Sequence, residues 1–323
     1  MKRLSVLGLL SLLFAVASAP APGAATSSYA YHWPVKPFDR QHPIRGGFGD
    51  PRTMAIDQPF GVTGPTDSGA YSFHSGVDIA AKPGTPVYPV VSGQVVMARP
   101  HEIVVAGSNR RSFQYWHLRG NVRVGQEVVA EQTVLGWIQR PFDHVHLTEI
   151  DNNRAQNPLA PGHLESYRDR TRPRAIALDF DNGQTPTLTE GGRLGPDDKL
   201  AIDAMDPPAL PVRGPFGGLP QAPALVEWRL RSGRTWGDWH VAADFRLTVP
   251  TRYSFWATYS PGTYQNFPVF ERRLCKGVAG LYLFRVELDP RLLQPGTYEL
   301  EARVTDIRGN SSRTTWQLQI GGA

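Results

Sequence analysis

The sequence contains a single cysteine, Cys275, in 323 residues. It therefore has no disulfide within the chain and no metal site built on a cysteine cluster. Basic and acidic residues nearly balance, with 34 Lys and Arg against 29 Asp and Glu, and the basic residues form no block. We therefore expect no nucleic-acid partner. Polar low-complexity sequence is also missing, and 41% hydrophobic residues are enough to build folded cores.

The N-terminus has the pattern of a secretory signal peptide, which we place at residues 1–25. Lys2 and Arg3 precede a 14-residue apolar run, and small residues follow as far as Ala25. As a helix this run would rise about 21 Å, short of the ~30 Å hydrocarbon core of a bilayer. No later run reaches the length of a membrane span. We expect a protein secreted or periplasmic in the bacterial cell envelope, with no membrane span in its mature form.

Glycine and proline are abundant, with 32 and 29 residues. Together they make up about a fifth of the chain, against an average of roughly 12%. Such frequent breaks favour short strands over long helices, so the sequence predicts a mainly β protein. In the first half we expect strands at 77–80, 86–90, 93–98, 103–106, 113–118, 127–129 and 145–150. The Gly-rich segment 50–73 between them is predicted to be a long loop.

The second half has the strand spacing of a β-sandwich. A charged linker at 166–174 separates a first domain, 26–165, from a second, 175–323. Strands are expected at 175–180, 199–205, 224–230, 239–245, 252–258, 280–288, 297–305 and 312–320. This number of short strands predicts an immunoglobulin-like β-sandwich. Trp236 and Trp239 could form a polymer-binding surface there, but we assign them to its core.

Four residues of the first domain have a spacing that suits a shared metal centre. His144 and His146 stand two apart on a predicted strand, so both point to one face, while Val145 points to the core. His74 and Asp78 would be about 13 Å apart on a straight strand, too far to share one ion. We therefore expect a bend at Gly76, with His74 on a loop and Asp78 entering a strand.

Two histidines and one carboxylate form a suitable zinc ligand set that leaves a fourth position open. Zinc in such a site acts as a Lewis acid and activates water, and further histidines can serve in proton transfer. His-x-His alone is a weak signal, because alternating strands produce it by chance.

A series of short motifs between residues 33 and 163 makes the signal specific. They are Gly46-Gly47-Phe48-Gly49, His74-Ser75-Gly76-Val77-Asp78-Ile79-Ala80, Gly84-Thr85-Pro86-Val87, Gly93-Gln94-Val95-Val96, Tyr115-Trp116-His117-Leu118, Val124-Gly125-Gln126, His144-Val145-His146 and Asn157-Pro158-Leu159. In these motifs and their order the sequence resembles the lysostaphin-type (LytM-like) zinc metallopeptidases, which cut peptide bonds in bacterial peptidoglycan. The resemblance implies an antiparallel β peptidase domain at 26–165.

The resemblance also implies roles for five residues. His74, Asp78 and His146 would bind one Zn²⁺ per chain, and His117 and His144 would be the catalytic pair. Which of the two is the base stays open. The implied substrates are peptidoglycan stem peptides or cross-bridges. The second domain is expected to be dispensable for hydrolysis of a small soluble peptide.

The sequence departs from the family pattern around the His-x-His motif. Residues 139–143 replace the usual Gly/Ser/Thr-rich approach, and Asp143 either hydrogen-bonds an imidazole or lies at the rim. The glutamate that commonly follows is displaced to Glu149 by Thr148. Two other functions stay open: a non-catalytic wall-binding regulator of another hydrolase, and an exported peptidase for a non-wall protein. Nothing in the sequence indicates the oligomeric state.

Overall fold

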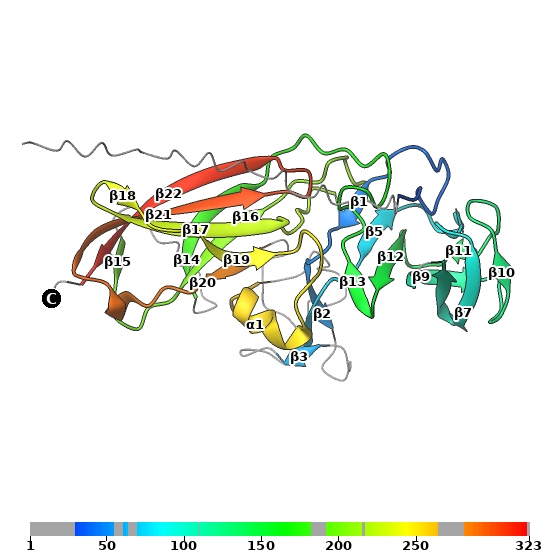
Figure 1. The fold of residues 1–323 in the computed structure, drawn as a ribbon, viewed down its shortest axis with the longest axis horizontal. Coiled ribbons are helices and arrows are strands. Elements are labelled where there is room, and N and C mark those ends of the chain that lie inside the picture. Colours follow the sequence, from blue (N-terminus) through cyan, green and yellow to red (C-terminus); the bar gives the residue numbers. More distant parts are fainter. Residues whose placement is uncertain are drawn as a thin grey trace, which may run out of the picture.

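The computed structural model describes residues 30–54, 61–63, 70–108, 110–181, 192–214, 217–263 and 281–321. The expected signal peptide and Cys275 lie outside the described residues. The described chain is mainly β, as predicted, and Figure 1 shows an elongated molecule. One large sheet lies at one end and the strands of the second half lie at the other. No helix in the described ranges has the length and apolar character needed to cross a membrane.

The first half forms a 10-stranded sheet in which all pairs are antiparallel. Its strands are β1 (Ile44–Gly46), β5 (Val77–Ala80), β6 (Pro86–Val87), β7 (Gly93–Arg99), β8 (His101–Gly107), β9 (Arg111–Gly120), β10 (Glu127–Val128), β11 (Gly136–Ile138), β12 (His144–Asp151) and β13 (Arg154–Gln156). The main order is β1-β5-β12-β9-β8-β7-β10. Alternate residues of the central strands, such as Tyr115, Val145 and Leu147, are fully buried, which confirms the period-two pattern.

The segment 50–73 contains a small three-stranded sheet, so the prediction of a long loop is wrong. Its strands are β2 (Pro51–Met54), β4 (Ala70–Phe73) and β3 (Val62–Thr63), in that order. Tyr71 and Phe73 of β4 pack their rings 5.5 and 5.2 Å from that of Phe255 in the second half. The apolar partner of these strands lies almost two hundred residues away in sequence. Local composition therefore could not reveal it.

The second half contains two further sheets. One consists of β14 (Arg174–Phe180), β16 (Leu200–Met205) and β20 (Leu283–Val286). The other has six strands: β15 (Gly192–Leu194), β17 (Leu225–Ser232), β18 (Thr235–Trp236), β19 (His240–Asp244), β21 (Gly296–Thr305) and β22 (Ser311–Ile320). Most of these strands match the predicted ranges. The immunoglobulin-like topology and the domain limits stay predictions.

The predicted strand at 252–258 is wrong, because the chain is helical there. A 3-10 turn, η1 (Arg252–Ser254), leads into the short helix α1 (Phe255–Thr258), and a second 3-10 turn, η2 (Pro290–Leu292), lies farther along. A helical turn brings residues four apart onto one side, so Phe255 and Tyr259 both reach the ring of Phe73. Burial of both aromatic rings outweighs the β preference of the segment.

Trp236 and Trp239 are half-buried on the surface of the six-stranded sheet, so their assignment to the core is wrong. The Arg229 guanidinium lies 4.5 and 4.4 Å from their ring centroids, and that of Arg303 lies 4.2 Å from Trp239. Stacking on arginine covers large aromatic faces without placing them inside the sheet.

The two halves share one continuous core. Phe245 and Tyr259 of the second half are fully buried, and their rings lie 5.7 and 5.8 Å from that of Phe73. The Tyr259 hydroxyl donates a hydrogen bond of 2.9 Å to the carbonyl of Gly49. The second half therefore packs directly against the loop between β1 and β2.

Candidate metal centre

Strand pairing and one bend bring the predicted ligands together. In the antiparallel pairing of β5 with β12, His146 stands directly opposite Asp78. His74 lies outside β4, and the chain bends at Gly76 before β5 begins, as predicted. Only glycine fits at position 76, because a Cβ there would lie 2.4 Å from the Leu147 carbonyl oxygen and 2.8 Å from His146 Nε2.

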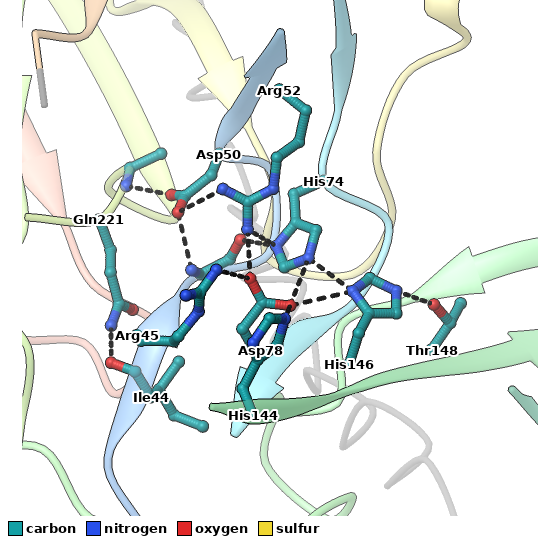
Figure 2. A network of polar contacts seen from close by, with 12 residues as sticks. Ile44, Arg45, Asp50, Arg52, His74, Asp78, His144, His146, Thr148 and Gln221 are labelled. Atoms are coloured by element: carbon teal, nitrogen blue, oxygen red, sulfur yellow. Dashed lines mark hydrogen bonds and ion pairs between the residues drawn. The ribbon is translucent and has the colours of Figure 1, made fainter. Parts of the chain in front are cut away.

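Three donor atoms converge on one point (Figure 2). His74 Nε2 lies 2.8 Å from His146 Nδ1 and 3.2 Å from Asp78 Oδ1, and the last two atoms are 3.1 Å apart. Zinc bonds of 2.0–2.2 Å at tetrahedral angles separate their donor atoms by roughly 3.3 Å. The three side chains therefore have nearly the spacing of one face of a zinc tetrahedron.

Hydrogen bonds to the outer ring nitrogens orient both imidazoles. His74 Nδ1 lies 2.7 Å from the Gly47 carbonyl oxygen, to which a proton on Nδ1 can be donated, and 2.9 Å from Arg52 Nη2. His146 Nε2 lies 2.7 Å from Thr148 Oγ1, a hydroxyl that can accept a proton from the ring. When both outer nitrogens carry the proton, the two nitrogens that face each other present lone pairs. A cation between them stabilises this arrangement, so the residues fit a zinc ion.

Two arginines hold the other oxygen of Asp78. Arg52 Nη2 donates to Asp78 Oδ2 at 2.8 Å, and Arg45 Nη2 lies 3.6 Å from the same atom. Burial by itself raises the pKa of Asp78, but attraction to His74, His144 and Arg52 outweighs it and holds that pKa well below its usual range. Burial, followed by the charge of Arg52, lowers the pKa of His74 to about 3. At neutral pH the centre therefore offers a carboxylate and a neutral imidazole.

The two predicted catalytic histidines lie beside this centre. His144 Nε2 is 3.6 Å from Asp78 Oδ1, and the His117 ring lies 4.5 Å from the His144 ring at an angle of 62°. Phe142 stacks on His117 at 3.9 Å. Burial is the main cause that lowers the pKa of both histidines. All five site residues predicted from the sequence thus meet in one cluster.

Asp143 lies at the rim, one of the two positions considered from the sequence. Its Oδ1 is 3.7 Å from His144 Nδ1, too far for a hydrogen bond, and 3.3 Å from Arg45 Nη1. Arg45 therefore contacts both Asp143 and the candidate ligand Asp78.

Sequence reasoning missed Arg45, Arg52 and the contact that Thr148 makes. Arg52 stands on β2, in a segment predicted as loop, so nothing local indicated its direction. Alternation along β12 places Thr148 on the same side as His146 and sends Glu149 to the other side. There Glu149 accepts hydrogen bonds from Tyr31 and His163 and pairs with Arg111, a buried network remote from the ligands.

One family model and several solved structures match part of this chain. Residues 72–158 match the model of Peptidase family M23. A zinc-containing peptidase from Vibrio cholerae is 27% identical over 40% of this chain, with a TM-score of 0.31, and the match spans only 39% of that protein. LytU is 24% identical over 37% of this chain and 83% of its own, with a TM-score of 0.27.

A variant catalytic domain of the prophage-encoded M23 protein EnpA from Enterococcus faecalis is 22% identical over 42% of this chain and 98% of its own, with a TM-score of 0.28. A comparison with curated proteins finds no match. All five clustered residues fall within the matched range 72–158. Residues 72–158 are therefore similar to the LytM-like peptidases of family M23, and the five clustered residues lie inside this matched range.

Proposed function

We propose that this protein is a zinc metalloendopeptidase that hydrolyses peptide bonds in peptidoglycan stem peptides or cross-bridges. The observation that carries the proposal is the convergence of His74 Nε2, Asp78 Oδ1 and His146 Nδ1, each held by a partner on its far side. In this proposal residues 26–165 form the peptidase domain, 166–174 the linker and 175–323 an immunoglobulin-like β-sandwich.

His74, Asp78 and His146 would hold one zinc ion. Zinc bound there supplies a Lewis acid toward the scissile carbonyl and the attacking water. Thr148 and the Gly47 carbonyl keep the imidazoles turned toward the ion. Arg45 and Arg52 keep Oδ2 of Asp78 occupied, so that its Oδ1 stays directed to the two histidines.

His117 and His144 are the proposed catalytic pair. Their lowered pKa values leave both rings neutral near pH 7, so either can accept a proton from the attacking water. The same ring can then return the proton to the leaving amine. His144 Nδ1 has no hydrogen-bond partner within the described part of the chain, and Asp143 Oδ1 lies 3.7 Å from it.

The proposed substrate and location follow from the family. M23 peptidases act on peptidoglycan and are generally extracytoplasmic. The signal-like pattern of residues 1–25 supports export from the cytoplasm. We therefore propose that the mature enzyme is secreted or periplasmic.

Zinc content and release of new amino termini from purified peptidoglycan test the proposal together. The wild type is expected to contain about one zinc per chain and to lose activity with a chelator. His146→Ala should lose both zinc and activity. His144→Ala should keep zinc, and its rate should fall about 10²–10⁴-fold, because a proton-transfer group typically accelerates a reaction by that factor. His240→Ala, at an exposed position on β19, is the matched control and should change neither.

The other two candidate functions give different outcomes. A chain that binds wall but releases no amino termini would be the non-catalytic regulator. Cleavage of exported proteins but not of peptidoglycan fragments would indicate a non-wall peptidase. Activity that persists in chelator would contradict the zinc mechanism itself.

A further inference from the structure

A second cluster of acidic side chains lies away from the histidines, in the second half of the chain. Asp169 comes from the charged linker, Asp206 directly follows β16, and Asp306 directly follows β21. One carboxylate oxygen from each lies within 4.8 Å of the other two. Asp206 and Asp306 are buried and Asp169 is half-buried. Three separate segments therefore direct negative charge to one place.

Neutral donors hold two of these carboxylates. Asp306 Oδ1 accepts hydrogen bonds of 2.8 Å from the backbone N–H groups of Arg308 and Asn310, and its Oδ2 accepts one from the Asn310 amide. Asp169 Oδ1 accepts from the backbone and hydroxyl of Thr171, and its Oδ2 from the Tyr167 hydroxyl at 3.2 Å. These contacts fix the carboxylates in place without supplying positive charge.

Asp206 gives the independent sign of a missing ligand. Its side chain belongs to a residue that is only 7% exposed, and its Oδ1 has no hydrogen-bond partner within the described ranges. An unpaired buried carboxylate is costly, so native proteins pair such groups or use them to bind metals. Burial, followed by the charges of Asp169, Asp306 and Asp50, raises the pKa of Asp206 well above its usual range.

Arg308 is a cation near the cluster, and its charge interacts with those of Asp306 and Asp169. Arg308 stacks over the Tyr167 ring at 5.1 Å and makes no ion pair within 4.0 Å with any of the three aspartates in the described part of the chain. Its buried Nε also has no hydrogen-bond partner there. The described part of the chain thus brings three carboxylates together with one arginine nearby and with no direct ion pair, so negative charge exceeds positive charge.

We propose that Asp169, Asp206 and Asp306 form a second metal site, which binds a Ca²⁺ ion. The donors are all oxygen atoms, which hard divalent cations prefer, whereas zinc favours nitrogen and sulfur. Calcium accepts six to eight oxygens in flexible geometry, while magnesium demands an octahedron and is reluctant to lose its waters. A site with one carboxylate oxygen from each of three aspartates, and with no nitrogen or sulfur donor among them, therefore suits calcium better.

The site lies where the linker, the end of β16 and the β21–β22 turn meet. The backbone of Asp206 pairs with that of Gln221 through two hydrogen bonds of 2.8 Å, and the Gln221 amide donates to the Ile44 carbonyl of β1 at 2.8 Å. Calcium would therefore tie the linker to the part of the second half that contacts the peptidase domain.

Calorimetric titration of the full mature chain with CaCl2 tests the proposal. The zinc-loaded protein is first freed of loosely bound ions on a chelating resin. We expect about one binding event per chain, weaker or no heat with MgCl2, and a rise in Tm of about 5 °C at calcium 100-fold above Kd. Asp206→Asn should abolish both the heat and the shift. Its Tm without calcium should equal or exceed that of the wild type, because the variant removes an unpaired buried charge.

Two further variants test whether calcium binds at the three aspartates and not elsewhere on the protein. Asp238→Asn removes an exposed carboxylate between β18 and β19 and should keep the full calcium response. His146→Ala should also keep it, since the zinc centre is a separate site. A wild type that ignores calcium would overturn the proposal, as would equal binding by Asp206→Asn or a calcium response lost in His146→Ala. None of these outcomes bears on whether the histidine centre is a peptidase site.

Discussion

At the scale of single residues, the orientation of the candidate ligands depends on hydrogen-bond partners that lie behind them. His74 and His146 each use one ring nitrogen toward the centre and the other toward a fixed acceptor. One of these groups is the backbone carbonyl of Gly47, which no substitution removes. The other is the hydroxyl of Thr148, a buried residue. Thr148 therefore offers the cleanest test of how the metal centre is held.

Thr148→Val keeps the shape of the side chain and removes the acceptor for His146 Nε2–H. Loss of an outer partner of a metal-bound histidine typically weakens metal affinity 10–100-fold. We expect a loss in that range, measured by competition for zinc with a chromogenic chelator. Thr148→Ser retains the hydroxyl and should bind zinc nearly as tightly as the wild type. Equal affinity in the valine variant would show that the hydroxyl does not orient His146.

At the scale of elements, β12 was predictable, whereas the strands β2 and β4 were not. Period-two alternation in β12 correctly assigns His144 and His146 to one face and Val145 to the core. The strands β2 and β4, which place Arg52 beside Asp78, were predicted as loop because they are short and the sequence between them is rich in turn residues. Their stability comes from aromatic packing against Phe255, not from their own β preference.

Gly46, at the end of β1, tests how closely these elements must approach. A Cβ on Gly46 would lie 2.4 Å from Arg52 Nη2 and 2.6 Å from Asp78 Oδ2. Gly46→Ala is therefore expected to displace Arg52 from Asp78 and to lower zinc affinity by about tenfold or more. Equilibrium dialysis against zinc measures the effect.

Gly237→Ala is the matched control for this substitution. A Cβ there meets only the Leu230 carbonyl at 3.5 Å, an ordinary contact, so zinc affinity should not change. If Gly46→Ala binds zinc as tightly as the control, close approach of β1 to Asp78 and Arg52 is not required for the site.

At the scale of the whole molecule, the second half supports the loop that lines the candidate centre. Asp50 Oδ1 accepts a hydrogen bond from the Ala222 backbone N–H at 2.7 Å, while its Oδ2 accepts one from Gly47 N–H at 2.8 Å (Figure 2). Gly47 in turn supplies the carbonyl that orients His74. A chain of contacts thus runs from the second half to a candidate ligand.

Removal of residues 173–323 tests this dependence. The sequence alone favours an accessory domain that a small peptide substrate does not need. The shared core argues otherwise, because truncation would expose Tyr71 and Phe73 and remove the partner of Asp50. We expect the fragment to aggregate or to retain less than a tenth of the wild-type zinc affinity and rate on a soluble peptide. A soluble fragment with full activity would show that residues 173–323 are not needed for hydrolysis of a small peptide.

The sequence by itself determined the β class, the facing pair His144 and His146 and the bend at Gly76, because strand alternation and ligand spacing are local properties of the chain. The full set of five residues came from the resemblance of its motifs to a known family. Only the tertiary structure decided what surrounds them: Arg45 and Arg52 on Asp78, helix α1 against β4, and three aspartates from distant segments in one place. These contacts join residues far apart in sequence, and their stability comes from burial and charge pairing between segments. A local sequence pattern does not predict which distant segment a strand or side chain will contact.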